Sequence, residues 1–209
     1  MKNKILVLMA HADDAEIWAG GTLLNHYRQN DDILFVYFFC NDKIRIKEAI
    51  NVAREFNAIV EFWSWPINLQ ESADLIAKFK PTIIITHWEK DTHHEHVKVY
   101  ESLLSIIPIL VVQHNLTFNV YCCDCYNSIS MDPNICFVPT NYVDITFMWK
   151  EKQRLISIYE SQPIKYWLKM IGNQNRMYGF RTGVGYAEGF IQIPVLGIIK
   201  KSTKLLKGG

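Results

Sequence analysis

Apolar runs of strand length recur along the first half of the chain, and segments with helical spacing separate them. The runs cover Ile5–Ala10, Ile33–Cys40, Ile59–Trp65 and Thr82–His87. Between the second and third runs, one helical face collects Ile46, Ile50, Ala53 and Phe56. Continuous apolar strands joined by helices are typical of a parallel sheet with helices on both faces. The pattern therefore predicts an α/β sandwich with a mainly parallel sheet.

The second half of the chain has a less regular pattern. It predicts strands at Leu110–Val112, Asn119–Tyr126 and Tyr142–Ile145, and a helix at Phe147–Glu160. Glycines from Gly172 through Gly185 predict a loop-rich stretch before a strand at Tyr186–Ile193. We expect one domain over residues 1–209, with a βα core at 1–108, further strands, a helix and loops at 109–200, and a frayed tail at 201–209.

Composition narrows the class of protein. With 209 residues and 49% apolar content, the chain is long enough to bury one substantial core. Its 22 basic and 21 acidic residues leave a net charge of +1, which gives no broad positive field for nucleic acid. The first apolar run is too short for a signal peptide core or a membrane span. Five cysteines, an odd number, favour reduced thiols and a cytoplasmic location.

Two polar clusters directly follow predicted strands. The first runs from His11 to Glu16, after the first strand, and the second from His87 to His96, after the fourth. Ligands of parallel sheets bind outside the carboxyl ends of the strands. We therefore expect both clusters to open on the same rim of the sheet.

The residue types in these clusters favour a metal site. A catalytic zinc ion takes about three ligands from imidazole and carboxylate groups and keeps a position open. His11, Asp14 and His96 supply such a set. Seven acidic or imidazole groups lie at two strand ends, and without a cation they would repel one another or have no use. They are His11, Asp13, Asp14, Glu16, His93, Glu95 and His96. Zinc is the expected metal, with another divalent cation such as Fe²⁺ as the alternative.

Neighbouring residues can divide the chemistry of such a site. Because Asp13 and Asp14 are adjacent, their side chains diverge, so that one binds metal while the other faces the attacking water as general base. A helix that begins near His93 places His93 and His96 on one face, where one binds metal and the other meets substrate. Glu16 either hydrogen-bonds a metal ligand or opens the following helix.

Both clusters resemble known signatures. His11-Ala12-Asp13-Asp14-Ala15-Glu16 resembles the His-Pro-Asp-Asp-x-Glu signature of the PIG-L/LmbE-like zinc-dependent N-acetylglucosaminyl deacetylases. The later segment from Asp91 to His96 resembles that family's Asp-x-His-Pro-Asp-His signature. Weaker matches follow in the same order, at Gly20-Gly21-Thr22, Arg45-x-x-Glu48-Ala49, Asp144-Ile145-Thr146, Ser161-Gln162 and Gly183–Phe190.

The resemblance implies a Rossmann-like three-layer fold and removal of an N-acetyl group from a glucosamine-type substrate. By resemblance, the metal ligands are His11, Asp14 and His96. Asp13 aligns with the general base, and His93 with the histidine that stabilises the oxyanion or helps to protonate the leaving amine. Arg45 aligns with an arginine that contacts substrate. Self-association in the family makes a homo-oligomer plausible by resemblance only.

The shell around the ligands departs from the family pattern. Ala12 and His94 replace the usual prolines, and Glu95 replaces an aspartate. We expect Asp91, Glu95 and Glu16 to support the ligands, because metal-binding imidazoles need orienting partners. Three tryptophans near strand ends are candidates to stack on a sugar, although core packing is favoured for them: Trp63, Trp65 and Trp88. Trp88, beside the second cluster, is the best candidate for substrate contact.

The leading hypothesis is a zinc-dependent hydrolase acting on a small-molecule N-acetyl amino sugar. Its substrate is a glycoconjugate, a nucleotide sugar, a thiol precursor or an antibiotic-like metabolite. One alternative is an amidase that releases a larger acyl or conjugate group. Another is a catalytically inactive member that binds metal or sugar, against which the presence of Asp13 argues.

Overall fold

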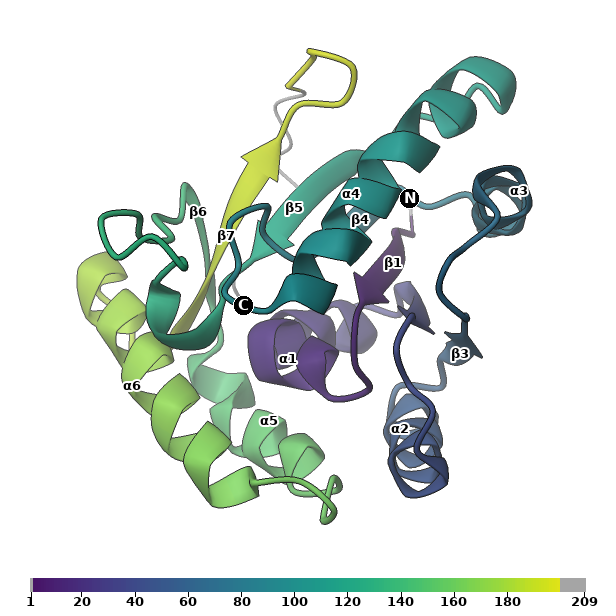
Figure 1. The fold of residues 1–209 in the computed structure, drawn as a ribbon. Helices are drawn as coiled ribbons and strands as arrows, with labels where there is room; N and C mark the ends of the chain where they lie inside the picture. Colours follow the sequence, from purple (N-terminus) through teal and green to yellow (C-terminus); the bar gives the residue numbers. More distant parts are fainter. Residues whose placement is uncertain (1, 200–209) are drawn as a thin grey trace.

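The computed structural model describes residues 2–199, so the tail predicted at 201–209 lies outside the described part of the chain. The strands are β1 (Lys4–Met9), β2 (Asp32–Tyr37), β3 (Ile59–Phe62), β4 (Ile83–Thr86), β5 (Asn119–Cys123), β6 (Asn141–Asp144) and β7 (Ala187–Ile193). The α-helices are α1 (Asp14–Arg28), α2 (Lys43–Glu55), α3 (Leu69–Phe79), α4 (His94–Pro108), α5 (Trp149–Ile156) and α6 (Ile164–Thr182). Figure 1 shows their arrangement.

The strands form a mixed sheet in the order β3-β2-β1-β4-β5-β7-β6. Strands β1 to β5 pair in parallel, whereas β7 runs antiparallel to both β5 and β6. The predicted α/β sandwich with a mainly parallel sheet is therefore confirmed. Because β1 pairs with both β2 and β4, the loop after β1 lies between the loops that follow these two neighbours.

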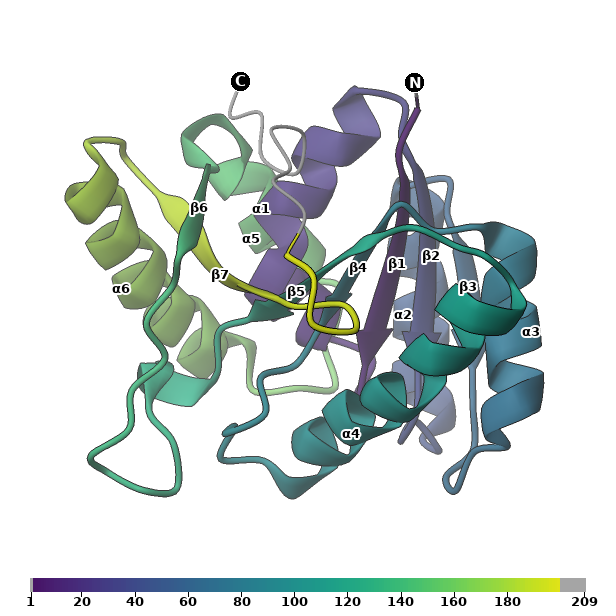
Figure 2. The same ribbon diagram turned by 90° about the horizontal axis from the view of Figure 1, so that it is seen from above.

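Helices cover both faces of the sheet, as Figure 2 shows. Side chains alternate along β1, so that Ile5 and Val7 join a core with α1, α2, α5 and α6, whereas Leu6 and Leu8 join a core with α3 and α4. All four of these side chains are fully buried. The continuous apolar run of β1 is thus explained by burial on both faces.

One predicted strand is wrong. Leu110–Val112 lies within a π-helical turn, Ile109–Gln113, which directly continues α4. A short apolar run fits a buried helix as well as a strand, and Leu110 is fully buried in the core. Pro108 at the junction has no backbone N–H to donate, and a wider turn is one way for a helix to pass such a residue.

The loop predicted from the glycines at 172–185 is also wrong over most of its length, because α6 continues to Thr182. Gly179 is needed for close packing, since a Cβ there would lie 2.7 Å from the carbonyl oxygen of Gly185. Gly183 ends the helix with φ 78°, a conformation that favours glycine. Gly179 is therefore explained by a close contact and Gly183 by the end of the helix. Only the residues after Thr182 form a loop before β7.

A buried ion pair connects the middle of α1 to the C-terminal half of the chain. Lys152 Nζ lies 2.7 Å from Glu188 Oε1, and both side chains are fully buried. Glu188 also accepts hydrogen bonds from the backbone N–H groups of Gly21 and Thr22, at 2.8 and 2.7 Å. A Cβ on Gly21 would lie 2.6 Å from Cγ2 of Ile145. The Gly-Gly-Thr motif thus serves close packing around this pair.

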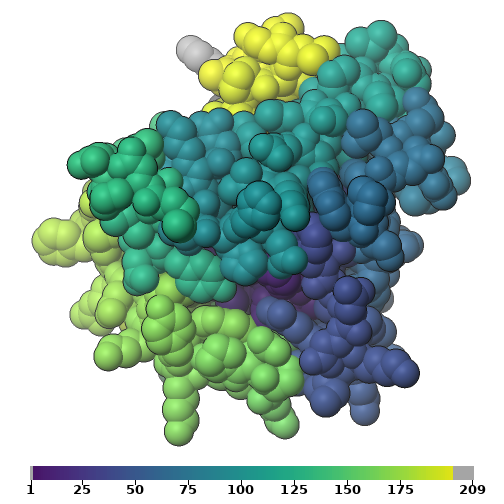
Figure 3. Space-filling view, in the orientation of Figure 1, coloured from purple at the N-terminus to yellow at the C-terminus, as the bar shows by residue number. Residues whose placement is uncertain are grey.

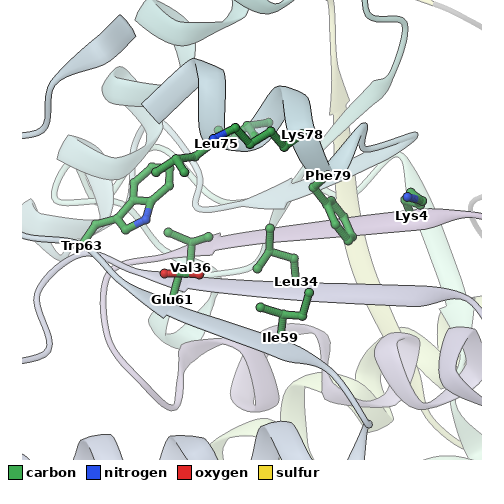
Figure 4. A pocket seen from close by; sticks show the side chains of 10 residues that line it. Lys4, Leu34, Val36, Ile59, Glu61, Trp63, Leu75, Lys78 and Phe79 are labelled. Carbon is green, nitrogen blue, oxygen red and sulfur yellow. The ribbon is translucent and has the colours of Figure 1, made fainter. Parts of the chain in front are cut away.

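A cavity of about 290 Å³ lies between the strand pair β2–β3 and helix α3 (Figure 4). Its walls are mostly apolar, with three charged side chains among them, and are formed by Lys4, Leu34, Val36, Ile59, Glu61, Trp63, Leu75, Ile76, Lys78 and Phe79. Trp63, one of the three candidate tryptophans, lines this cavity, whereas the predicted metal ligands, Asp13, His93 and Arg45 do not. Across residues 2–199, the helices are too short or too polar to traverse a bilayer.

Candidate metal centre and active site

The two polar clusters meet at the carboxyl ends of β1 and β4. These strands are paired in parallel, with Ile5 opposite Ile83, so their following loops are neighbours. Helix α1 begins at Asp14 and helix α4 at His94, which places two helix N-termini at the same rim. On the face drawn in Figure 3, purple atoms of the N-terminal segment lie in a hollow between teal atoms above and green and blue atoms below.

The structure brings His11, Asp14 and His96 together, with one donor atom from each within 4.8 Å of the others. Asp14 Oδ2 lies 3.2 Å from His11 Nδ1 and 3.4 Å from His96 Nε2. Two ligand atoms that each lie about 2.0–2.1 Å from a tetrahedral zinc ion are about 3.4 Å apart. Asp14 Oδ1 and His96 Nε2 are buried without a hydrogen-bond partner. This donor set fits a zinc ion or a similar divalent cation.

In both His11 and His96, the ring nitrogen that does not face Asp14 forms a hydrogen bond with a carboxylate. Asp91 Oδ2 lies 2.8 Å from His96 Nδ1, and Glu95 Oε2 lies 2.6 Å from His11 Nε2. In the neutral form that binds a metal, these nitrogens are the donors, so that the lone pairs of His96 Nε2 and His11 Nδ1 face Asp14. Such carboxylate partners fix the tautomer and the ring orientation of a metal ligand. The longer Glu95 thus provides a carboxylate for His11.

Charge in the centre favours a cation. Burial alone lowers the pKa of His96, but Asp14 and Asp91 reverse this effect and raise that pKa to about 10. His87 is also fully buried, and its Nε2 accepts the backbone N–H of Ala10 at 2.9 Å. Burial and the charge of His96 lower the pKa of His87 to about 4, so His87 is neutral. It stacks on His96 with ring centroids 3.7 Å apart, which agrees with a supporting role.

Asp13 lies beside this group and is almost completely buried, with 1% exposure. Arg45, which follows β2 in the first turn of α2, donates from Nη2 to Asp13 Oδ2. Burial and the charge of Asp14 raise the pKa of Asp13 to about 6, while Arg45 acts in the opposite direction. The predicted base and the predicted substrate-contacting arginine therefore form an ion pair.

His93 caps the N-terminus of α4 and stays exposed at the rim. Its ring centroid lies 4.8 Å from that of His11 and 4.7 Å from that of His96. Its Nδ1 accepts the backbone N–H of Glu95 at 3.3 Å, which assigns the proton to Nε2. Burial, followed by the charges of His96 and His11, lowers the pKa of His93. His93 thus offers a neutral N–H donor next to the candidate metal ligands.

Two predicted residues lie in different surroundings. Glu16 is fully buried in α1 and accepts a hydrogen bond from the Tyr159 hydroxyl at 3.0 Å. Burial raises the pKa of Glu16 to about 8. Trp88 is only 7% exposed, and its ring packs edge-on against Phe137 with centroids 5.3 Å apart. A direct contact from either residue to a ligand or substrate therefore stays a prediction.

Sequence reasoning missed how the C-terminal half reaches the site. Glu48, one turn after Arg45 in α2, accepts hydrogen bonds from Ser161 through its backbone N–H at 2.9 Å and its hydroxyl at 2.6 Å. The α5–α6 loop is thereby fixed to the helix that carries Arg45. Glu48 and Ser161 belong to two of the weaker motifs noted in the sequence, but neither motif alone indicates a contact between them.

The chain's N-terminal half matches a known family. The family model of PIG-L, described as GlcNAc-PI de-N-acetylase, matches residues 6–107, a segment that contains both polar clusters. Through this segment, which is slightly less than half of the chain, the protein is similar to the PIG-L family. No curated protein matches the chain.

Solved structures with the same fold perform different reactions. N,N'-diacetylchitobiose deacetylase from Pyrococcus horikoshii is 19% identical, with TM-score 0.75, and the match covers 98% of this chain and 89% of that one. GalB from Pseudomonas putida, a 4-carboxy-2-hydroxymuconate hydratase, is 20% identical, with TM-score 0.77 and coverage of 98% and 99%. A conserved protein from Thermus thermophilus is 18% identical, with TM-score 0.78 and coverage of 96% and 98%. At these identities the likeness extends to the fold alone.

Proposed function

We propose that this protein is a metal-dependent hydrolase that removes an N-acetyl group from an N-acetylglucosamine-type amino sugar. The observation that carries the proposal is the arrangement of Asp13 and His93 around the group formed by His11, Asp14 and His96. A buried carboxylate and a neutral imidazole donor thus flank one candidate cation site. The description of the PIG-L family as a de-N-acetylase supports this reaction.

The donor set defines what a metal contributes. Zn²⁺, or another divalent cation such as Fe²⁺, held by His11, Asp14 and His96 would polarise the acetyl carbonyl and make a water molecule more acidic. Asp91 and Glu95 keep the two imidazoles in the orientation that binding requires.

Asp13, Arg45 and His93 serve proton transfer and the stabilisation of charge. Asp13 accepts a proton from the attacking water as the water oxygen bonds to the acetyl carbon. His93 Nε2–H donates a hydrogen bond to the acetyl oxygen while negative charge develops there. The carbon–nitrogen bond then breaks, and the proton passes from Asp13 to the sugar nitrogen. Acetate and a free amino sugar leave. Arg45 favours the ionised form of Asp13 before attack.

Related chemistry gives the competing proposals. An amidase would use the same residues on a larger acyl group. The fold shared with a hydratase adds a further possibility, in which Asp13 would move protons during addition of water to a carbon–carbon double bond. A cytoplasmic location and self-association stay predictions from the sequence and the resemblance.

The test is acetate release from a panel of N-acetylglucosamine derivatives that differ at the anomeric position, with bulkier N-acyl analogues alongside. We expect turnover of at least one N-acetyl compound by the wild-type protein loaded with Zn²⁺. Asp13→Asn should retain the metal and lose at least about a hundredfold in kcat, as expected for loss of a general base. Asp132→Asn, which changes an exposed aspartate, is the matched control. Stoichiometric zinc binding without release of any acid from the panel would refute the hydrolase.

A further inference from the structure

An aromatic wall borders the candidate metal centre on the side of β2 and β3. Phe39 follows β2, and its backbone N–H donates to the carbonyl oxygen of Ala10 at 2.8 Å, which brings it beside His11. The ring centroids of Phe39 and His11 are 6.5 Å apart. Trp65, which follows β3, packs on Phe39 with ring centroids 5.6 Å apart and an interplanar angle of 32°. Two rings from separate strand ends thus continue outward from the candidate ligand His11.

The indole of Trp65 is available to a ligand, whereas the neighbouring tryptophans are used in packing. Trp65 is 39% exposed. Trp63, two residues earlier, turns its ring to Phe38 at a centroid distance of 5.4 Å and lines the cavity in Figure 4. Trp88 is buried against Phe137. Of these three, Trp65 alone presents a partly exposed ring next to the site.

A cation completes the wall. Lys98, in the second turn of α4, places its Nζ 5.9 Å from the ring centroid of Phe39 and 5.9 Å from that of Trp65. Contact with both rings restrains the ammonium group, which carries three N–H donors. An aromatic face beside a hydrogen-bond donor suits a pyranose ring, which has an apolar C–H face and oxygen atoms around its edge.

We propose that Phe39, Trp65 and Lys98 form a subsite for a second sugar ring, linked to the N-acetyl amino sugar that reacts at the metal centre. The inference rests on the proposed function for the identity of the first ring. Trp65 and Phe39 pack on the C–H face of the second ring, and Lys98 donates to its oxygen atoms. The preferred substrate is therefore at least a disaccharide, with its acetamide at His11, Asp14 and His96.

The test compares a β-linked dimer of N-acetylglucosamine with the monomer, using zinc-loaded full-length protein. We expect wild-type kcat/KM to be on the order of tenfold or more higher for the dimer, and Trp65→Ala to lower this ratio on the order of tenfold, as loss of one stacked ring predicts. Trp65→Phe should keep most of the preference. Lys98→Met should lower the ratio by about threefold to tenfold, since the aliphatic stem remains. Trp63→Phe is the matched control and should leave the ratio unchanged.

Calorimetric titration of Asp13→Asn with the intact dimer separates this inference from the proposed hydrolysis, because binding is read without turnover. Tighter binding of dimer than monomer, weakened by a further Trp65→Ala change, supports the subsite even if the wild-type protein releases no acetate. Acetate release with equal kcat/KM for dimer and monomer, unaffected by Trp65→Ala, would overturn the subsite and leave the hydrolase intact.

Discussion

The buried pair of Lys152 and Glu188 gives the sharpest test of how the C-terminal half is held to the site. Glu188 accepts four hydrogen bonds, from Gly21 N, Thr22 N, Thr22 Oγ1 and Lys152 Nζ, at 2.8, 2.7, 2.6 and 2.7 Å. Lys152 also donates to Asn175 Oδ1 at 3.0 Å. Lys152→Met keeps most of the side-chain volume and removes only the ammonium group, so that the Glu188 carboxylate stays buried without its counter-charge.

The expected loss of stability in Lys152→Met follows from the burial of the Glu188 carboxylate. Breaking a buried ion pair by removal of one partner destabilises a protein by about 3–5 kcal/mol, because an uncompensated charge remains. For a domain whose unfolding free energy is about 5–15 kcal/mol, this is a third or more of the total in most cases. Lys2→Met makes the same chemical change in the exposed pair with Asp32 and should cost at most about 1 kcal/mol.

Urea unfolding at pH 7, followed by circular dichroism, measures both variants. The double variant Lys152→Met/Glu188→Gln should be less destabilised than the sum of its single variants, by about 1 kcal/mol or more, because it removes both charges together. If Lys152→Met cost no more than Lys2→Met, or if the two changes were additive, the pair would not hold these segments as described.

Three further predictions concern the site and the packing around it. Glu95→Gln should weaken zinc affinity by about 10–100-fold, measured by competition with a chelator, because a ligand imidazole loses its carboxylate partner; unchanged affinity would contradict this role. Burial raises the pKa of Asp124 to about 6, so the folded state binds this proton more tightly than the unfolded state and the stability from Asp124 grows as pH falls. Between pH 7 and 5, the unfolding free energy of wild type relative to Asp124→Asn should rise by about 1.4 kcal/mol, and a constant difference would argue against the shift. Gly21→Ala should cost about 1–3 kcal/mol in the same denaturation assay, since its Cβ meets Ile145 at 2.6 Å. Gly172→Ala, whose nearest contact is 3.7 Å away, should instead stabilise α6 by about 0.5–1 kcal/mol, and similar effects for both changes would refute the packing argument.

The sequence predicted the half of the fold in which local pattern and burial agree. The apolar run at Ile5–Ala10 is long, buried on both faces and followed at once by polar residues. The sequence therefore predicts both that it is a strand and where the strand ends. Leu110–Val112 has the same composition but lies at the end of a helix, and only the tertiary position of Leu110 distinguishes the two cases. In α6, Gly179 was misread because its function is contact with Gly185, which no local pattern encodes.

Some features of the site could likewise be predicted from the sequence, and others could not. That His11, Asp14 and His96 lie close together could be predicted because they occur at two neighbouring strand ends with a recognisable order, while their role as metal ligands stays a prediction. Partnerships between distant residues could not, because the burial of Lys152 and the exposure of Trp65 depend on which elements pack above them. A lysine in a short amphipathic helix is usually exposed. Lys152 is buried here because it forms an ion pair with Glu188, which lies on strand β7.

In the proposed reaction, a cation held by His11, Asp14 and His96 enables this chain to hydrolyse an N-acetyl amino sugar. The most direct measurement is acetate release by one preparation that is stripped with a chelator and then titrated with Zn²⁺. We expect negligible acetate release from the stripped protein, and recovery that reaches its maximum at one zinc ion per chain. Release that persists in the stripped protein, or that fails to appear at full zinc occupancy with every N-acetyl sugar in the panel, would contradict it.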